Sequence, residues 1–211
     1  MIDRRDPPGR LIVVSSPSGG GKGTLIRRVL KEVPNLGYSV SYTTRQARPG
    51  ETNGRDYFFV TTATFIEMER AGAFLEWANV HGNLYGTARA QVERELMEGR
   101  DIILEIDVQG AKSVRSLVSA AVSVFILPPS FDVLCERLTA RGSERADDLS
   151  LRLRNARGEV EHYNEFEYVI INDEADRAAR QLASIVYAER ARRERQVYLA
   201  KRVLATFQPP S

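Results

Sequence analysis

The sequence predicts an α/β fold in which helices flank a mostly parallel sheet. Short apolar segments of strand length alternate along the chain with amphipathic segments of helix length. Residues 11–14 read Leu-Ile-Val-Val, a fully apolar run typical of a strand that is covered on both faces. A run of glycines follows that strand and leads into a helical pattern. With 211 residues, we expect the whole chain, residues 1–211, to form a single domain.

The composition is that of a globular protein with a sizeable core. Hydrophobic residues make up 43% and charged residues 27% of the chain. A formal net charge of +2 is too balanced to indicate nucleic-acid binding, and no apolar run approaches the ~20 residues that span a bilayer. The single cysteine excludes an internal disulfide, and the N-terminus lacks a signal-peptide pattern. We therefore expect a cytoplasmic protein with no nucleic-acid or membrane partner.

Periodicity sets the order of the core elements. Apolar residues recur at helical spacing from Leu25 to Val33, and Pro34 ends that helix. The alternation of strands and helices implies right-handed crossovers in the sheet. The expected core strands are residues 10–15, 38–42, 102–107, 122–127 and 168–172, and the expected helices are residues 22–33, 131–141 and 174–202.

Residues 43–90 interrupt this alternation. Short aromatic strands are expected at 57–60, 74–80 and 83–85, with a short helix near 64–70. Thr64 and Glu67 have the spacing of a capping box for that helix, and Gly72 ends it. We interpret the segment as a small mixed α+β insertion between two halves of the core.

The strongest functional signal is the loop between the first strand and the first helix. Its sequence, S-P-S-G-G-G-K-G-T at residues 16–24, lies where a phosphate-binding loop lies. Glycines let backbone N–H groups surround a phosphate, the helix N-terminus adds partial positive charge, and Lys22 adds a full charge. Ser16 replaces the usual first glycine, and Gly23 replaces the hydroxyl residue that contacts Mg²⁺. The loop narrows the fold prediction to a P-loop NTPase-type sheet.

Charged residues in the insertion suggest what else the protein binds. Arg45 and Arg48 follow the second expected strand, and two guanidinium groups suit a phosphate dianion, although such a pair is more often a solvated loop. On a half-buried strand Glu76 would point opposite to Leu75 and Trp77. A carboxylate in a cleft accepts two donors. Guanine offers them at N1–H and its exocyclic amine, whereas adenine presents an acceptor at N1.

Asp107 is a second candidate carboxylate. It ends the expected strand 102–107, at the edge where ligands of open α/β sheets bind. Two roles suit it there, contact with a ligand or its Mg²⁺, and capping of the next helix. The sequence leaves both roles open.

These blocks together resemble the guanylate kinase family over nearly the whole chain, from about residue 11 to residue 195. The matching segments are S-S-P-S-G-G-G-K-G-T at 15–24, S-Y-T-T-R-Q-A-R-P-G-E-T-N-G-R-D-Y at 41–57, F-L-E-W-A at 74–78, G-N-L-Y-G-T at 82–87, L-E-I-D-V-Q-G at 104–110 and H-Y-N-E-F-E-Y-V-I-I-N-D at 162–173. The resemblance implies transfer of the γ-phosphoryl group of ATP to GMP, and to dGMP, giving ADP and GDP.

The resemblance also implies the site residues. ATP is expected at Ser18, Gly19, Gly20, Gly21, Lys22, Gly23, Thr24 and Asn172. GMP is expected at Ser41, Arg45, Arg48, Tyr57, Glu76, Tyr85, Thr87 and Asp107. The expected catalytic groups are Lys22, Arg45, Arg141 and Arg152. Residues 43–90 would form the GMP-binding insertion and residues 137–158 a mobile lid. Mg²⁺ would be bound chiefly through ATP, and no residue is assigned to it.

Two other functions stay open on the sequence. Guanylate-kinase-like domains of scaffold proteins bind peptides without catalysis, but their phosphate loops are typically degraded, whereas residues 19–22 are intact here. The string G-K-G-T resembles adenylate kinase and leaves a kinase for another nucleoside monophosphate as the second alternative, which Glu76 and Asp107 oppose. The basic C-terminal helix is typical of a solvated face, and assembly into a homo-oligomer is compatible with the sequence.

Overall fold

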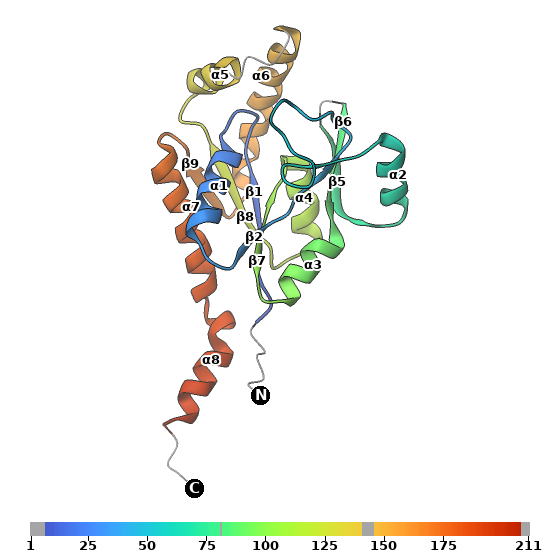
Figure 1. Ribbon diagram of the computed structural model, residues 1–211. Coiled ribbons are helices and arrows are strands. Elements are labelled where there is room, and N and C mark those ends of the chain that lie inside the picture. The colour runs from blue at the N-terminus through green and yellow to red at the C-terminus, as the bar shows by residue number, and fades with distance from the viewer. Residues whose placement is uncertain (1–6, 81, 141–145, 208–211) are drawn as a thin grey trace.

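The computed structural model of the chain describes residues 7–80, 82–140 and 146–207, with the side chains of 146–150 and 152 left out. Its centre is a five-stranded parallel sheet in the order β2-β7-β1-β8-β9 (Figure 1). The strands are β1 (Leu11–Ser15), β2 (Leu36–Tyr38), β7 (Asp101–Glu105), β8 (Val122–Leu127) and β9 (Tyr168–Ile171). Each neighbouring pair in this sheet is parallel, which confirms the predicted α/β architecture.

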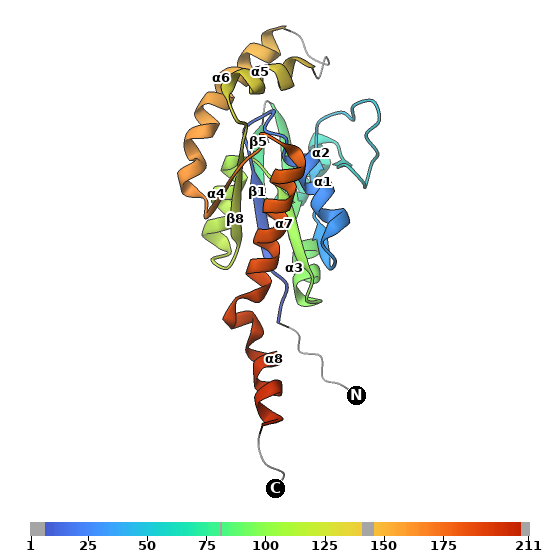
Figure 2. The same ribbon diagram turned by 90° about the vertical axis from the view of Figure 1, so that its left-hand side faces the viewer.

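Helices cover both faces of this sheet (Figure 2). They are α1 (Lys22–Glu32) and α7 (Ala175–Ala191) on one face, and α3 (Arg89–Met97) and α4 (Val108–Leu117) on the other. Side chains of β1 alternate between the two layers. Ile12 and Val14 pack with α1 and α7, while Leu11 and Val13 pack with α3 and α4. This two-sided burial explains why β1 is apolar at successive positions.

The segment between β2 and α3 forms a second sheet in the order β4-β3-β6-β5. Its strands are β3 (Tyr42–Thr43), β4 (Phe58–Phe59), β5 (Phe74–Val80) and β6 (Asn83–Ala88). Helix α2 (Thr62–Arg70) packs on it through Phe65, whose ring stacks on that of Phe74 with centroids 4.5 Å apart. The segment is thus a mixed α+β unit, as predicted.

Two helices lie at the carboxyl ends of the parallel strands, at the top of Figure 1. They are α5 (Phe131–Ala140) and α6 (Ala146–Val160), which pack together through Leu134, Leu138 and Ala156. A 3-10 turn, η1 (Glu161–Glu165), connects α6 to β9. Within the described ranges, no helix has the length and apolarity needed to cross a membrane.

Two predicted elements are wrong in their extent. The strand expected at residues 38–42 does not exist as one unit, because β2 ends at Tyr38 and β3 begins at Tyr42 in the other sheet. The helix expected at 174–202 is broken by the backbone of Arg192, at φ −54° and ψ 137°, into α7 and α8 (Arg193–Ala205). Figure 2 shows α8 continuing away from the body of the molecule.

The predicted capping box of the short helix is also wrong. The helix begins at Thr62, and Thr61 is its N-cap. The hydroxyl of Thr61 accepts a hydrogen bond from the N–H of Thr64 at 3.1 Å. Thr64 therefore donates to the cap instead of forming it, and the first turn lies three residues earlier than a Thr64 cap requires.

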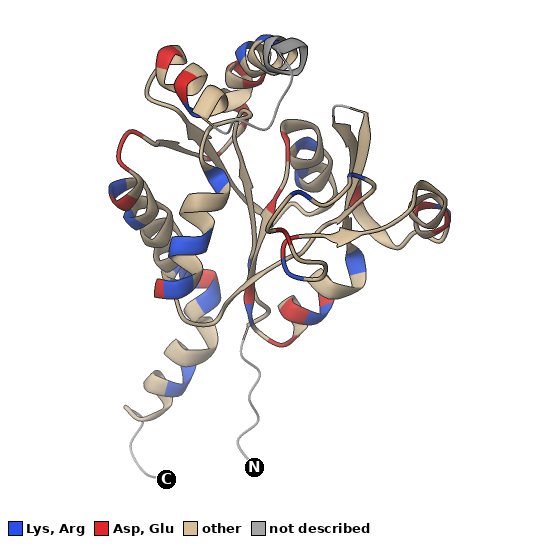
Figure 3. Cartoon of the chain, turned by 45° about the horizontal axis from the view of Figure 1, so that its top comes forward, with Lys and Arg blue, Asp and Glu red and all other residues tan. Residues whose placement is uncertain are grey.

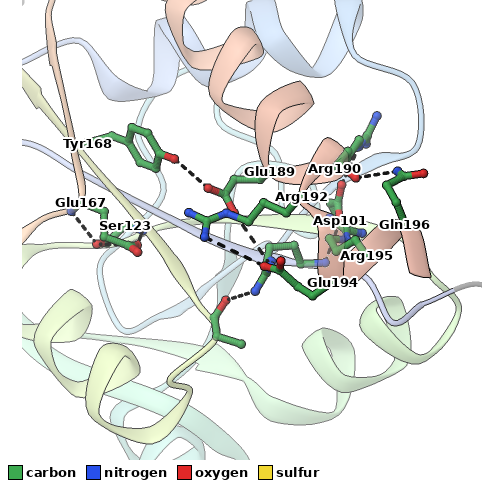
Figure 4. Close-up of polar contacts among 12 residues, drawn as sticks. Asp101, Ser123, Glu167, Tyr168, Glu189, Arg190, Arg192, Glu194, Arg195 and Gln196 are labelled. Atoms are coloured by element: carbon green, nitrogen blue, oxygen red, sulfur yellow. Dashed lines mark hydrogen bonds and ion pairs between the residues drawn. The ribbon is translucent and has the colours of Figure 1, made fainter. Parts of the chain in front are cut away.

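A buried ionic cluster holds α7 and α8 against the sheet (Figure 4). Asp101 is only 2% exposed and accepts hydrogen bonds from Arg190 at 2.7 Å and Arg195 at 2.9 Å. Glu189, also 2% exposed, pairs with Arg192 at 2.8 Å. Since α8 buries no side chain of its own, these ion pairs fix its start on the fold.

Candidate active site

A cleft of about 240 Å³ opens at the carboxyl ends of the parallel strands, between the loop after β1 and the second sheet. Figure 3, in which this end of the molecule is turned forward, shows acidic and basic positions interspersed along its loops and helices. The cleft is lined by Ser16, Pro17, Ser18, Gly19, Gly20, Gly21, Lys22, Gly23, Ser41, Arg48, Tyr57, Glu76, Ala78, Val80, Tyr85, Glu105, Ile106, Asp107 and Glu159. The structure therefore brings the predicted phosphate loop and most of the predicted insertion residues to one site.

The loop after β1 has the backbone shape of an anion-binding loop. Gly19 and Gly21 adopt φ values of 85° and 90°, which favour glycine. Gly21 is also the N-cap of α1, so the loop N–H groups and the helix N-terminus lie together beside the cleft. A Cβ on Gly21 would lie 2.3 Å from Nδ2 of Asn172. The loop therefore requires glycine at this position, and Lys22 follows it on the cleft.

Asn172 supports this loop. Its side chain is buried, and Nδ2 donates to the carbonyl oxygen of Gly20 at 2.8 Å. Arg137 donates to the backbone carbonyl of Asn172 at 2.9 Å. Asn172 and Thr24, both predicted at the ATP site, are not among the residues that line the cleft, and Thr24 is exposed. The structure thus places Asn172 behind the loop and Thr24 beside it, on the first turn of α1.

Glu76 is a buried carboxylate that faces the cleft. Its side chain is 7% exposed and accepts a hydrogen bond from the hydroxyl of Thr87 at 2.5 Å. Burial raises the pKa of Glu76 to about 7, and the nearby charge of Asp107 adds to that rise. The simple alternation predicted for this strand is interrupted beside Glu76. A register shift in β5 between Phe74 and Glu76 leaves Leu75 buried in the core.

Asp107 fills the capping role and also lines the cleft. Its Oδ1 accepts a hydrogen bond from the N–H of Gly110 at 2.9 Å, which caps α4. The two roles that the sequence left open are therefore compatible in geometry. Gly110 also makes room for the other carboxylate, because a Cβ there would lie 2.6 Å from Oε2 of Glu76. The turn that caps α4 thus holds Glu76 and Asp107 side by side.

Two arginines and two tyrosines lie on the insertion side of the site. Arg48, Tyr57 and Tyr85 line the cleft, and the two tyrosine rings meet edge to face with centroids 5.9 Å apart. Arg45 instead forms a two-point ion pair with Glu51, at 2.8 and 2.9 Å. Although burial opposes the shift, the hydrogen bond from Arg45 holds the pKa of Glu51 below its usual value. The cation of Arg45 is therefore paired with an anion of the protein itself.

Sequence reasoning missed Glu105 and Glu159. Glu105 is the last residue of β7, and a Cβ on Gly23 would lie 3.3 and 3.4 Å from its two carboxylate oxygens. The hydroxyl of Tyr38 donates to Glu105 at 3.3 Å, and burial followed by the Glu105 charge raises the pKa of Tyr38 far above its usual range. The signal was available, because residues 105 and 107 of an extended chain point to the same side.

The remaining predicted residues are Ser41, Thr87, Arg141 and Arg152. Ser41 is buried and lines the cleft, while Thr87 is fully buried and reaches it only through Glu76. Arg141 lies outside the described residues. Arg152 lies in α6, but its side chain is outside the description as well.

Comparison with known proteins agrees with this geometry. The guanylate kinase family model matches residues 8–189. The chain is 48% identical over 197 residues to a guanylate kinase of Nitrosomonas europaea, covering 93% of this chain and 98% of that protein. It is 46% identical over 184 residues to one of Thermotoga maritima, covering 87% and 89%. The crystal structure of guanylate kinase from Anaplasma phagocytophilum aligns with a TM-score of 0.78 at 34% identity, covering 96% of this chain and 97% of that one.

Proposed function

The chain belongs to the guanylate kinase family, and we propose that its cleft carries out the transfer of the γ-phosphoryl group of ATP to GMP and dGMP, giving ADP and GDP. One observation carries the proposal. A phosphate-binding loop and a pair of carboxylates, Glu76 and Asp107, line the same cleft. The loop suits the phosphates of one nucleotide, and the carboxylates suit the base of another.

The guanine base is proposed to lie against Glu76 and Asp107. Guanine presents two donors, N1–H and the 2-amino group, and ionised carboxylates accept both. Adenine would set its N1 acceptor against these oxygens, and a buried mismatch of this kind lowers affinity strongly. Ser41 supplies a hydroxyl on the cleft for the O6 of guanine, while Thr87 holds Glu76 in place.

The GMP phosphate is proposed to lie at Arg48, Tyr57, Tyr85 and Arg45. The first three already line the cleft. Arg45 would exchange Glu51 for the phosphate, a change that replaces one two-point anion contact by another. Because Glu51 also accepts the N–H of Arg48 at 2.8 Å, it holds both arginines of this segment in register before GMP arrives.

ATP is proposed to bind along residues 18–23, with Lys22 at its phosphates. Mg²⁺ is the expected cofactor, and when bound it neutralises charge on the phosphate oxygens. Gly23 offers it no hydroxyl, but Glu105 places a carboxylate in the space beside Gly23, and Asp107 lies next along the cleft. In the described part of the chain no three His, Cys, Asp or Glu residues are grouped to hold a metal. We propose that Mg²⁺ is bound chiefly through the phosphate oxygens of ATP.

The transfer itself requires positioning and charge neutralisation. An oxygen of the GMP phosphate attacks the γ-phosphorus in line, and the bond from that phosphorus to the ADP oxygen breaks. No general base is needed, because the second pKa of the GMP phosphate is near 6 and the attacking oxygen is ionised at pH 7. We assign charge neutralisation to Lys22 and Arg45, and to Arg141 and Arg152 of a lid formed by residues 137–158. Closure of that lid would exclude water from the γ-phosphate.

We propose that the reaction takes place in the cytoplasm, because a chain with a single cysteine has no internal disulfide that would require an oxidising compartment.

A non-catalytic binding module is disfavoured because the phosphate loop keeps its lysine and its glycines, two of them in the left-handed conformation.

Calorimetric binding of GMP and AMP tests the proposed base recognition. GMP should bind the unaltered protein, and AMP should bind at least a hundredfold more weakly. Glu76→Gln should weaken GMP about tenfold or more without changing ATP affinity, because the ionised acceptor is lost. Glu67→Gln, on an exposed position of α2, is the matched control. Equal affinity for GMP and AMP would overturn the base assignment.

A further inference from the structure

A carboxylate from helix α6 is hydrogen-bonded to the phosphate loop. Oε2 of Glu159 accepts the backbone N–H of Ser18 at 3.0 Å. Glu159 is half-buried, lies in the last turn of α6 and lines the cleft, alone among the residues of α6 whose side chains the structure describes. It comes from a segment 141 positions further along the chain, so the contact joins two separate parts of the fold.

The loop attracts this carboxylate for the same reason that it suits a phosphate. Gly19 and Gly21 adopt the left-handed conformation common in anion-binding loops, α1 begins there, and Lys22 adds a positive charge. A carboxylate oxygen and a phosphate oxygen are both charged acceptors at hydrogen-bond distance. Glu159 therefore satisfies a donor of the proposed phosphate site.

A phosphate and this carboxylate exclude each other. The Ser18 N–H is a single donor, and two anions that share it would repel each other in a cleft that screens charge less than bulk water. We propose that Glu159 competes with the phosphates of ATP for the loop, so that ATP binds fully only after displacing this carboxylate and the last turn of α6. The inference rests on the proposed function in one respect, that the loop binds ATP.

If ATP displaces its carboxylate, Glu159 is a positioning residue that determines where the end of α6 lies. While its carboxylate lies on Ser18, the C-terminal end of α6 is held at the loop. When nucleotide phosphates take that place, α6 is released to adopt another position. Part of the ATP binding free energy is thereby used to move α6, and movement of α6 becomes conditional on phosphate at the loop.

A purely structural role for Glu159 predicts the opposite sign. If the carboxylate only held the loop in shape, its removal would loosen the loop and weaken ATP binding. If it is a competitor, its removal frees the donor and strengthens ATP binding. The direction of the change in ATP affinity therefore separates the two roles.

The test measures ATP binding without GMP, by calorimetry, for the unaltered protein, Glu159→Ala and Glu159→Gln. Glu159→Ala should bind ATP roughly tenfold more tightly, the order expected when a charge-assisted hydrogen bond no longer has to be broken. Glu159→Gln, which keeps an acceptor but loses the charge, should show a smaller gain. Inorganic pyrophosphate, a probe that has no base, should bind these three proteins in the same order of affinity, most tightly to Glu159→Ala and most weakly to the unaltered protein. Glu161→Gln, on the exposed turn after α6, is the control and should stay within twofold.

Hydrogen exchange supplies a second readout. ATP should increase amide exchange in residues 153–160 of the unaltered protein, whereas Glu159→Ala should show the faster exchange before ATP is added. Unchanged or weaker ATP binding in both Glu159 variants would overturn the proposal, as would ATP-induced protection of residues 153–160. Failure of the unaltered protein to bind ATP would overturn the proposed function instead, and the inference with it.

Discussion

Glu76 is a buried carboxylate whose ionised form is disfavoured in the folded protein. Burial raises its pKa from the reference value of 4.5 to about 7. Because the pKa of the folded protein lies above that of the unfolded chain, the folded state favours the protonated form. The contribution of Glu76 to stability is therefore full below pH 4.5 and is lost as pH rises through 7. Above pH 7 the folded protein carries the Glu76 carboxylate as a buried anion, and its oxygens can accept hydrogen bonds from a ligand.

The raised pKa predicts a pH dependence of GMP binding. Guanine donors require the ionised form of Glu76, so GMP affinity should be constant above about pH 8 and fall as pH drops through 7, approaching tenfold for each pH unit below it. Dissociation constants measured from pH 6 to pH 8.5 check this. The phosphate of GMP also titrates near pH 6, and Glu76→Gln isolates that contribution because it lacks the carboxylate. Identical pH profiles for the two proteins would contradict the assignment.

Gly110 makes room for Glu76 and Asp107, the two carboxylates that we propose recognise the base. A methyl group there would lie 2.6 Å from Oε2 of Glu76 and 3.2 Å from Oδ1 of Asp107, so Gly110→Ala must displace one of them. We expect KM for GMP to rise tenfold or more while KM for ATP stays nearly constant.

Gly158→Ala is the matched control for Gly110→Ala. Gly158 lies in a helix, and a Cβ there meets nothing within 4 Å. The control should keep its KM for GMP, because Gly158 lies in the proposed lid segment and not at Glu76 or Asp107, and it should gain ~0.5–1 kcal/mol of stability from helix propensity. Steady-state kinetics and thermal melts distinguish the two variants. A normal KM for GMP in Gly110→Ala would show that the carboxylates have room to move.

At the scale of elements, ion pairs fasten the two C-terminal helices to the sheet. Asp101 lies at the start of β7 and accepts donors from α7, from α8 and from the N–H of Arg10 at 2.6 Å. A single buried carboxylate therefore joins three separate parts of the chain (Figure 4). By contrast, the ion pair between Arg28 of α1 and Asp176 of α7 is exposed at the surface.

These two ion pairs predict very different losses of stability. Asp101→Ala leaves two arginines without their buried anion and should lower the free energy of unfolding by about 3–5 kcal/mol. Asp176→Ala should lower it by less than about 1 kcal/mol, because exposed pairs contribute little. Urea unfolding of both variants measures the difference. Equal losses would show that the Asp101 cluster is not the main attachment of α7 and α8.

Elements were predictable where local patterns and tertiary contacts agree. The strand expected at residues 122–127 has those same bounds as β8, because an apolar run bounded by Pro128 leaves little freedom. The strand expected at 38–42 failed because nothing local shows that its residues change from one sheet to another. The break at Arg192 has no Gly or Pro to mark it, and it follows from the ion pairs around α7 and α8.

Part of the candidate site was predictable from the sequence, and part depends on tertiary contacts. The loop at residues 16–24 and Glu76 carry their chemistry in the sequence, and the structure places the loop residues 16–23 and Glu76 on one cleft. Glu105 escaped notice because Asp107 two positions later drew the same interpretation. Glu159 carries no local signal at all, since only the packing of α6 brings it to Ser18. The sequence also did not show that Arg45 pairs with Glu51 and is not among the residues that line the cleft.

At the scale of the whole molecule, the cleft lies between two sheets that have no strand in common. The parallel sheet supplies the loop and Glu105, and the second sheet supplies Glu76 and Tyr85, with Tyr57 directly before β4. In the proposed function each unit binds one nucleotide, so the relative position of the two units would set the distance between the reacting phosphates. Transfer to the acceptor instead of water requires that both units hold their nucleotides at once.

ADP production by the purified protein is the most direct test of this account. The assay contains ATP and Mg²⁺ with GMP, dGMP, AMP, UMP or no acceptor. The account predicts turnover with GMP and dGMP, and only a small fraction of that rate with AMP, UMP or water. Turnover with AMP in place of GMP would contradict the assignment of Glu76 and Asp107 to guanine. Rapid hydrolysis of ATP without any acceptor would contradict the claim that transfer depends on both nucleotides being bound together.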